Sequence, residues 1–398
     1  MNPTRDALSG LRIIDLTRVL AGPFCTMMLA DMGAEVVKIE QPRKGDDTRH
    51  FAPFQNGESA YYMNLNRGKR GITLNLKGQG KEIFLDLIRT ADVVVENFRP
   101  GTMDKLGLGY DKLKEINPKL VYAAVSGFGD NGPYRLRPGY DIIGQAMGGL
   151  MSTTGWPGGE PTRSGTAMAD VLAGLSVTIG ILSALRHRDQ SGVGQKVDVA
   201  LVDSVVASLE IITQIYLTDG RIPERIGNRY ESCYPYDSFS AKDGSVVIAA
   251  ANDKLWGLVC EAIEQPELAC DGRFDTNAKR VERHGEIKPL IESWTRRHNV
   301  DDVVEKMLAV GVPASPINTV DRLVTDPHIA GARQMFVDME HPRAGKTKLT
   351  GCHIKLSATP ARLRSPAPQL GEHNAAVFGG LLGLTADEIA QLQLDGVI

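Results

Sequence analysis

Asp170 is the side chain in this sequence best suited to covalent chemistry. It begins an apolar segment, because residues Val171 to Leu185 carry no charge. A carboxylate beside such a segment is costly to keep unless something uses it. Two roles fit this position. One is a helix N-cap, whose oxygen accepts backbone N–H groups, and the other is a nucleophile held ionised by the positive end of a helix dipole.

Other reaction chemistries find little support. The sequence has no GxSxG elbow for a serine hydrolase, and none of its cysteines stands beside an obvious base. The first strand-and-turn reads LTRVLAGPF, with Gly22 as its single glycine, so the closely spaced glycines of a nicotinamide-binding loop are missing. A GxxxxGK[ST] phosphate loop and an HExxH motif are also absent, and the eight histidines are dispersed. We therefore expect neither a nicotinamide nor a metal, and Asp170 remains the best candidate nucleophile.

A second group of candidates follows an expected strand. In ENFRPG, Asn97, Phe98 and Arg99 come directly after DVVVEN, at the edge of a sheet where α/β proteins bind ligands. Arg99 and Lys105 can hold phosphates, and Phe98 can stack on a flat ring. The plainer alternative is a strand-end loop closed by a Pro-Gly turn.

Three further loops contain polar or flexible residues near these candidates. GDDTR (45–49) contains Arg49, and it is either a ligand loop or a solvated turn. Tyr140 and Asp141 lie beside the glycine-rich stretch GQAMGGL. Residues 151–165 form a long glycine-rich loop before Asp170, as lids of active sites often do.

The composition is that of a soluble globular protein. The chain has 398 residues, 42% hydrophobic and 23% charged, and a net charge of −3. No run of Lys and Arg is longer than two, so nucleic acid and membrane surfaces are not expected partners. Five cysteines without CxxC spacing fit a reducing cytoplasm, and the first residues contain no apolar secretion signal. The apolar segment after Asp170 is shorter than the ~20 residues of a membrane span, so we expect a buried helix.

Alternating patterns predict an α/β fold with a parallel sheet. Strands are expected at 11–16, 35–40, 92–97, 120–129 and 196–201, with helices between them and one long helix ending near Thr218, and a further strand is expected at 245–253. The length suggests two domains. The pattern changes near residue 220, so we expect a first domain at 1–220, a smaller α/β domain at 221–319 and a C-terminal part at 320–398. In that last part, KLTGCHIKLS predicts a strand pair and TADEIAQLQL a short helix.

Together these motifs resemble the class III CoA-transferases, a family that includes formyl-CoA transferase. The resemblance runs from end to end and rests on LRIIDLTRVLAGPF, GDDTR, LNRGKRGITLNLK, VVVENFRPG, SGTAMAD, GQKVDVALVDS, VPASPINTV and LGEHN. DLTRVLAGPF, GDDTR and MEHPRAGK are most similar to the branch that uses succinyl-CoA and dicarboxylates. The resemblance implies a Rossmann-like large domain formed by both chain ends, and an interlocked homodimer.

The resemblance also implies a mechanism. In this family the aspartate of the SGTAMAD position, here Asp170, attacks an acyl-CoA and passes through a mixed anhydride to an aspartyl-CoA thioester. An acceptor acid then reverses the steps. Water must be excluded while the anhydride exists, and coenzyme A is a substrate here, without a permanently bound cofactor.

The family's ligand positions carry over one by one. Val19 and Leu20 match the contact after the first strand, where formyl-CoA transferase has a glutamine at the place of Leu20. Tyr140 matches a tyrosine lining the thioester site, Asp141 stands in for a glutamate, and Arg49, Tyr140 and Asp141 are expected to bind substrate. The CoA-binding positions expected from the resemblance are Val19, Leu20, Gln41, Leu74, Lys77, Asn97, Phe98, Arg99, Lys105, Arg137 and Tyr140.

The same fold also occurs in α-methylacyl-CoA racemases. These enzymes use a histidine in a GHDI motif to move a proton, and here the motif reads GYDI. Tyr140 is a poor base at neutral pH, with an ordinary pKa of about 10. We therefore favour the transferase over the racemase, with a dehydrogenase and a non-catalytic CoA-binding protein as further alternatives. Arg18, Arg49, Arg137 and Arg163 are candidate partners for a dicarboxylate acceptor.

Overall fold

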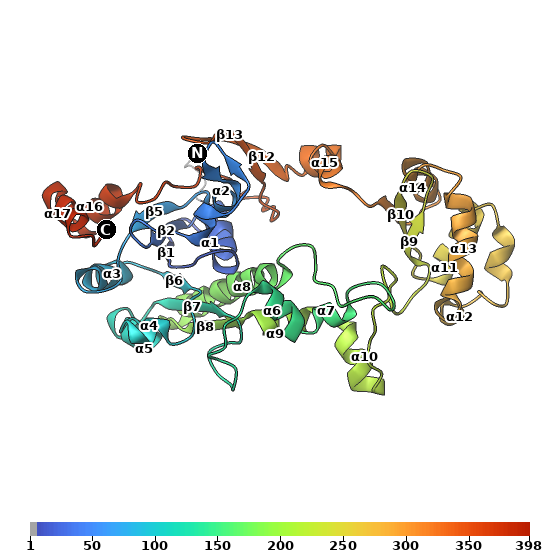
Figure 1. The fold of residues 1–398 in the computed structure, drawn as a ribbon, viewed down its shortest axis with the longest axis horizontal. Coiled ribbons are helices and arrows are strands. Elements are labelled where there is room, and N and C mark those ends of the chain that lie inside the picture. Colours follow the sequence, from blue (N-terminus) through green and yellow to red (C-terminus); the bar gives the residue numbers. More distant parts are fainter. Residues whose placement is uncertain (1–5) are drawn as a thin grey trace. The chain divides into compact units, whose positions relative to one another are not determined.

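The computed structural model describes residues 6–398, which divide into two compact units (Figure 1). The larger unit contains the chain up to Leu150, Arg163–Gln214 and Pro327–Ile398. The smaller unit contains Met151–Thr162 and Ile215–Asp326. The glycine-rich segment 151–162, which the sequence pattern places in the first domain, therefore belongs to the smaller unit, and both boundaries of the small domain shift by a few residues.

A six-stranded parallel sheet forms the centre of the larger unit. The strands occur in the order β5 (Arg70–Thr73), β2 (Glu35–Glu40), β1 (Arg12–Asp15), β6 (Val93–Glu96), β7 (Val121–Ser126) and β8 (Lys196–Ala200). The chain builds outward from β1 to β5, then returns to the other side of β1 and builds outward again. The strand order reverses between β1 and β6, and such a reversal opens a crevice at the carboxyl ends of the two strands.

The predicted α/β fold with a parallel sheet is confirmed, as are five of its strands. The short strand β5 was not predicted, because RGIT follows the charged residues Arg67 and Lys69 and has Ile72 as its single large apolar residue.

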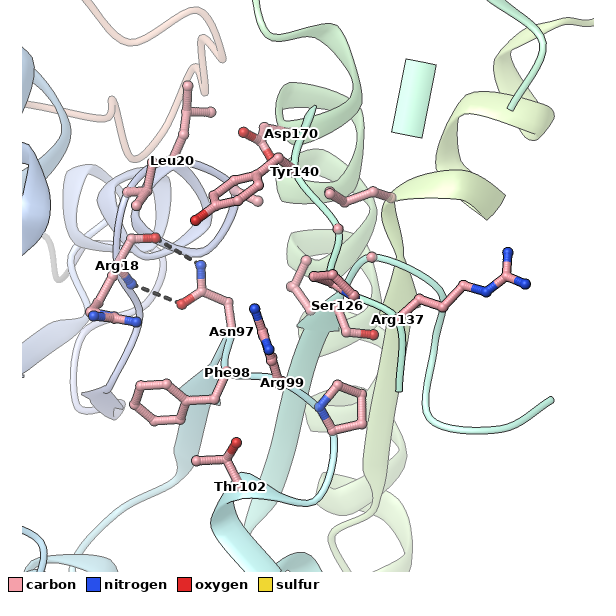
Figure 2. Close-up of a pocket in the computed structure, with 18 of the residues that line it drawn as sticks. Arg18, Leu20, Asn97, Phe98, Arg99, Thr102, Ser126, Arg137, Tyr140 and Asp170 are labelled. Carbon is pink, nitrogen blue, oxygen red and sulfur yellow. Dashed lines mark hydrogen bonds between the residues drawn. The ribbon is translucent and has the colours of Figure 1, made fainter. Parts of the chain in front are cut away.

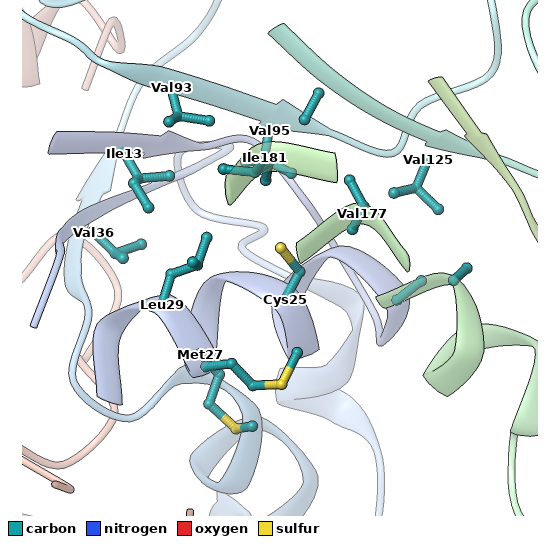
Figure 3. Packing of buried hydrophobic residues seen from close by; sticks show 14 of the residues in the cluster. Ile13, Cys25, Met27, Leu29, Val36, Val93, Val95, Val125, Val177 and Ile181 are labelled. Carbon is teal, nitrogen blue, oxygen red and sulfur yellow. The ribbon is translucent and has the colours of Figure 1, made fainter. Parts of the chain in front are cut away.

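Alternate residues of the strands point to two apolar layers. Ile13, Val93 and Val95 face helices α1 (Ala21–Asp31) and α8 (Met168–Ser191), as Figure 3 shows. Ile14 and Val94 face the opposite layer. That layer contains α3 (Gln79–Arg89), α5 (Tyr110–Ile116), α16 (Asn374–Leu382) and α17 (Ala386–Leu394). The C-terminal helices thus complete a core that the N-terminal strands begin.

Helix α8 is longer than the apolar segment predicted from the sequence. It has 24 residues, so by length and composition it is long enough to cross a membrane. Its buried residues Val177 and Ile181 instead pack in the core beside α1. Gly174 permits this packing, because a Cβ there would lie 2.8 Å from the carbonyl oxygen of Ala21.

Two other predictions for the larger unit are wrong in detail. The expected helix to Thr218 is broken into α9 (Leu201–Ser208) and α10 (Ile211–Asp219), since Glu210 takes a positive φ of 36°. The expected strand pair at 348–357 is instead a hairpin of β12 (Phe336–His341) and β13 (Gly345–Thr350). The turn of that hairpin lies within MEHPRAGK, while the predicted C-terminal helix is present as α17.

The remaining short elements of the larger unit connect these layers. They are η1 (Asp47–His50), β3 (Phe54–Gln55), β4 (Glu58–Ser59), α2 (Ala60–Asn66), α4 (Thr102–Lys105), α6 (Asp141–Met147) and η3 (Pro327–Ala332). A further short helix, α7 (Leu150–Thr153), begins at the last residue before the segment 151–162.

The smaller unit has its own sheet and core. Its antiparallel strands occur in the order β11 (Ala314–Pro316), β10 (Ser245–Ala249) and β9 (Tyr236–Ser240). Trp256 and Trp294 are fully buried against this sheet's helices. The helices of the smaller unit are α11 (Asp253–Ala262), η2 (Pro266–Cys270), α12 (Asn277–Glu282), α13 (His284–Thr295), α14 (Val300–Ala309) and α15 (Val320–Leu323).

Candidate active site

Asp170 occupies the first turn of α8 and lines a cavity. The helix begins at Met168, its N-cap is Ala167, and Asp170 is the third helical residue. The interpretation of Asp170 as the helix N-cap is therefore wrong. Its carboxyl group instead lines a cavity of about 370 Å³ at the carboxyl edge of the sheet, which we call the Asp170 cavity. This places the candidate nucleophile at the crevice that the strand order opens.

A second carboxylate serves as the cap of this helix. Asp141 Oδ1 accepts the backbone N–H groups of Ala169 at 2.9 Å and Asp170 at 3.4 Å. Asp141 is the first residue of α6, and it is not among the residues that line the Asp170 cavity. Asp141 was predicted to bind substrate; in the structure its carboxylate contacts the first backbone amides of α8.

Burial, followed by the nearby charge of Asp141, raises the pKa of Asp170 to about 7. The direction of this shift runs against the expectation that the helix N-terminus holds Asp170 ionised. The first free amides of the helix are bonded to Asp141, so they do not stabilise the charge of Asp170.

Two loops bonded to each other form one wall of the Asp170 cavity. Asn97, after β6, accepts the backbone N–H of Arg18 at 2.8 Å and donates to its carbonyl oxygen at 2.7 Å (Figure 2). Arg18 follows β1, so the two bonds join the loops on either side of the strand reversal. The Arg18 side chain is paired with Asp47 at 3.2 Å, and both line the cavity.

Buried charges support this wall from behind. Val19 has a φ of 66°, which is strained for a β-branched residue, and its N–H donates to Asp46 Oδ1 at 3.3 Å. Lys38 Nζ donates to Asp46 at 2.9 Å and to the carbonyl oxygen of Thr17 at 2.8 Å. Although burial favours the neutral acid, Lys38 and the bonds from Thr48 hold the pKa of Asp46 well below its usual range. The charge therefore persists and keeps the loop in its strained form.

Close contact of two glycines shapes the opposite wall. A Cβ on Gly127 would lie 2.7 Å from the Cα of Gly139, so neither position has room for a side chain. Gly139 precedes Tyr140, which is 72% exposed and lines the cavity with Arg137. The contact fixes the path of the chain just before α6 and its cap residue Asp141.

A second cavity of about 260 Å³ adjoins the first, and we call it the Leu74 cavity. Arg18 and Phe98 line both cavities, so they stand at their common border. The predicted CoA-binding residues Gln41, Leu74 and Lys77 line the Leu74 cavity. The predicted residues that line the Asp170 cavity are Val19, Leu20, Asn97, Phe98, Arg99, Arg137, Tyr140 and Asp170.

Besides Asp141 and Arg163, two other predicted ligand residues line neither cavity. Arg49 donates to both carboxylate oxygens of Glu40, at 2.8 and 2.7 Å, and to the hydroxyl of Tyr62 at 2.6 Å. Lys105 is an exposed residue at the end of α4. The guanidinium of Arg49 is thus used within the protein, which leaves Arg18, Arg99 and Arg137 as the arginines of the Asp170 cavity.

The sequence interpretation also missed three residues that line neither cavity but contact or influence residues of the site. Tyr61 on α2 is close enough to Asp170 that burial, followed by the charge of Asp170, raises the pKa of its phenol to about 12. Gln145 is fully buried and bonds to Asp141 Oδ2 at 2.8 Å. Glu96 accepts the N–H of Phe98 at 2.7 Å, and burial raises the pKa of Glu96 to about 7. Gln145 lies four residues after Asp141 on one helix face, and this spacing was the available signal.

Within residues 6–398, no group of three or more His, Cys, Asp or Glu side chains is arranged to hold a metal ion. The described site offers a partly buried carboxylate that lines a cavity, and arginines line the same cavity. Such a site suits an anionic ligand and covalent catalysis by the carboxylate.

Comparison with known proteins agrees with this chemistry. Residues 8–374 match the model of CoA-transferase family III. The chain is 40% identical to succinyl-CoA–D-citramalate CoA-transferase of Chloroflexus aurantiacus over 98% of each chain. It is 41% identical to succinate–glutarate CoA-transferase of Agrobacterium fabrum, over 94% of this chain and 95% of that one. Among solved structures, a CaiB/BaiF family protein of Brucella suis matches with a TM-score of 0.84 and 40% identity, over 95% of this chain and all of the other.

Proposed function

Because the chain belongs to CoA-transferase family III, we propose that it moves coenzyme A from succinyl-CoA to a dicarboxylic acid through a covalent intermediate on Asp170. One observation carries the mechanism: the Asp170 carboxyl group lies at the start of α8 and lines a cavity of about 370 Å³. The named succinyl-CoA and succinate transferases that it resembles supply the choice of donor.

The covalent steps balance without water or a metal. An Asp170 carboxylate oxygen attacks the thioester carbon of the donor, the C–S bond breaks, and CoA leaves as the thiolate. The thiolate then attacks the Asp170 carbonyl of the mixed anhydride, which releases the donor acid and leaves an aspartyl-CoA thioester. The acceptor carboxylate attacks this thioester, and the same two steps in reverse give the new acyl-CoA and free Asp170.

Coenzyme A spans the two cavities in this proposal. The adenine end occupies the Leu74 cavity beside Gln41, Leu74 and Lys77, and the pantetheine passes Phe98 to reach Asp170. Arg18 and Phe98 line both cavities, which suits a ligand that continues from one into the other. Lys77 and Arg18 supply positive charge for the phosphates.

The acceptor needs a partner for its second carboxylate. Arg18, Arg99 and Arg137 line the Asp170 cavity, while Arg49 is paired with Glu40 and Arg163 bonds to the carbonyl oxygens of Ser164 and Thr166. Arg99 is therefore the best candidate for holding the free end of a dicarboxylate, with Arg18 left for CoA, because the guanidinium of Arg137 lies over the Tyr134 ring, 3.6 Å from its centroid. Two copies of the chain form a homodimer in this proposal, and the enzyme works in the cytoplasm.

The test is a transfer assay with succinyl-CoA and a panel of acids. Glutarate, malate, citramalate and oxalate are compared with carnitine and with the monocarboxylate butyrate, and each acyl-CoA product is identified by mass spectrometry. We expect dicarboxylates to react at least tenfold faster than butyrate or carnitine. Equal or faster transfer to carnitine or butyrate would contradict a dicarboxylate acceptor. Solvent deuterium entering a 2-methylacyl-CoA without any acceptor would indicate the racemase instead.

A further inference from the structure

We propose that Asp141 and Gln145 of α6 form a clamp that holds the first turn of α8 and makes acylation of Asp170 more favourable. This inference rests on the proposed function, since it concerns the reactivity of the same carboxylate. It assigns to Asp141 and Gln145 a positioning role in place of a direct contact with substrate. Both side chains act through Asp170 and the segment before it.

The clamp consists of five hydrogen bonds. Gln145 Nε2 donates to Asp141 Oδ2 at 2.8 Å and to the carbonyl oxygen of Thr166 at 3.3 Å. Gln145 Oε1 accepts the N–H of Ser164 at 2.9 Å. Asp141 Oδ1 accepts the N–H groups of Ala169 and Asp170. The two side chains therefore hold residues 164–170, the segment that leads into α8, at four backbone groups.

The first turn of α8 depends on this external cap. Its own N-cap residue, Ala167, has no side chain that can accept a hydrogen bond. Gly144 lets α6 approach, because a Cβ there would lie only 2.9 Å from the Cβ of Ala169. Gln145 is fully buried, and its amide has hydrogen-bond partners at both its oxygen and its nitrogen. This geometry fixes the backbone that carries the nucleophile.

The clamp also controls the charge around Asp170. It bonds the amides of the helix N-terminus to Asp141, and it places the negative charge of Asp141 beside the nucleophile. The ionised Asp170 is consequently less stabilised than a carboxylate at a free helix N-terminus. Once Asp170 is acylated it is neutral, and the repulsion from Asp141 disappears. The clamp therefore raises the energy of the free carboxylate more than that of the anhydride or thioester.

Several other groups face Asp170 and set the background for its titration. Tyr61 on α2 is coupled to it electrostatically, and Arg18, Asp47, Arg99 and Arg137 line the same cavity. None of these residues is itself replaced in the Asp141 and Gln145 variants. Asp141 also contributes to the raised pKa of Tyr61, but that pKa is about 12, so Tyr61 stays neutral over the range in which Asp170 titrates.

The test uses the full-length protein and two readouts. Carbon-13 NMR of aspartate-labelled protein follows the titration of the Asp170 carboxyl, which is assigned by its absence in Asp170→Asn. The pH dependence of kcat/KM for succinyl-CoA is measured alongside. Asp141→Asn keeps an oxygen for the two amides and removes the charge, whereas Gln145→Leu keeps the charge and removes the bonds that orient it. Gln391→Leu and Asp395→Asn are matched controls, because Gln391 Nε2 donates to Asp395 Oδ1 at 2.9 Å, also across four residues, at the C-terminal end of α17.

For Asp141→Asn we expect the Asp170 midpoint to fall by about one pH unit or more, together with the acid limb of kcat/KM. The share of enzyme trapped as aspartyl-CoA should fall at least fivefold. For Gln145→Leu we expect kcat to fall tenfold or more, with thermal unfolding showing that the protein remains folded. Neither control should change either readout.

An unchanged Asp170 midpoint in a folded Asp141→Asn variant would overturn the clamp. If the wild-type protein transfers CoA in that case, the proposed function stands and only the clamp fails. If the NMR midpoint falls as expected while the wild-type protein shows no transfer with any acid, the electrostatic effect of the clamp stands and the proposed function fails.

Discussion

Asn97 bonds to both backbone groups of Arg18, at 2.8 Å to the nitrogen and 2.7 Å to the oxygen. One side chain thereby joins the loop after β6 to the loop after β1, at the point where the strand order reverses. An amide is suited to this contact because it has a donor and an acceptor on one flat group. These two hydrogen bonds keep Arg18 and Phe98 at the border of the two cavities.

We expect Asn97→Leu to raise the KM for the acyl-CoA about tenfold, because the loss of two hydrogen bonds costs roughly 1–3 kcal/mol. Steady-state kinetics with succinyl-CoA measure this change. Asn117→Leu is the matched control, since Asn117 donates to the carbonyl oxygens of Ile88 and Ala91 and lines none of the cavities described above. The control should lower the melting temperature with little effect on KM. Equal KM values for the two variants would count against the role of Asn97.

Asp170→Asn should stabilise the protein at alkaline pH while abolishing transfer. The pKa of Asp170 is about 7 in the folded chain, above the ordinary aspartate value of 3.8, so ionising it costs stability as pH rises from about 4 to above 7. The variant removes this cost, by about 1–3 kcal/mol at pH 8 and by almost nothing near pH 4. Thermal and urea unfolding across this pH range measure the difference. A variant that is less stable than wild type at pH 8 would contradict the raised pKa, and the exposed Asp203→Asn should show no such trend.

Lys38→Met should destabilise the larger unit by about 3–5 kcal/mol, because it leaves the buried carboxylate of Asp46 without its partner. Lys38 and Asp46 are both fully buried, and Lys38 Nζ lies 2.9 Å from Asp46 Oδ2. Urea unfolding measures the loss, and the exposed pair Lys112 and Glu115 provides a control whose disruption should cost under about 1 kcal/mol. Transfer activity should fall as well, since Asp46 also holds Val19. If Lys38→Met lowered the free energy of unfolding by no more than the control, the buried pair would contribute little to stability.

Gly127→Ala should lower kcat by roughly a hundredfold, because its Cβ would collide with Gly139 and displace the backbone that leads to Tyr140 and Asp141. Gly257→Ala is the control, since a Cβ on Gly257 meets no atom within 4 Å. Steady-state kinetics and thermal unfolding of both variants check this prediction. A folded Gly127→Ala enzyme with wild-type kcat would show that the glycine contact does not shape the site.

The layers of the fold were accessible from the sequence because they depend on local patterns. Runs such as RIID and VVVE are short, apolar and bounded by turns, and they become β1 and β6. The break at Glu210 was not accessible, because a positive φ at a glutamate follows from packing and not from any local preference. The strand β5 escaped prediction for a related reason, since it gains its place by pairing with β2.

The site was predictable at the nucleophile and less so around it. Asp170 stands out because a charge at the start of an apolar segment is unusual. Its cap came from Asp141, 29 residues earlier, and the only signal for the buried partner Gln145 was its spacing of four residues from Asp141. Arg49 looked like a ligand residue in sequence, yet its place opposite Glu40 depends on the distance between β2 and η1 in the folded chain. These contacts join residues that the fold brings together, and the local sequence gives little sign of such pairs.

The most direct test of the account is to trap the covalent intermediate. The protein is incubated with succinyl-CoA, treated with hydroxylamine or borohydride, digested, and examined by peptide mass spectrometry. We expect a hydroxamate or a reduced product on the peptide that contains Asp170, and none when the Asp170→Asn variant is treated in the same way. An unmodified Asp170 peptide with succinyl-CoA and acetyl-CoA, in protein that still binds CoA, would contradict the covalent transferase mechanism.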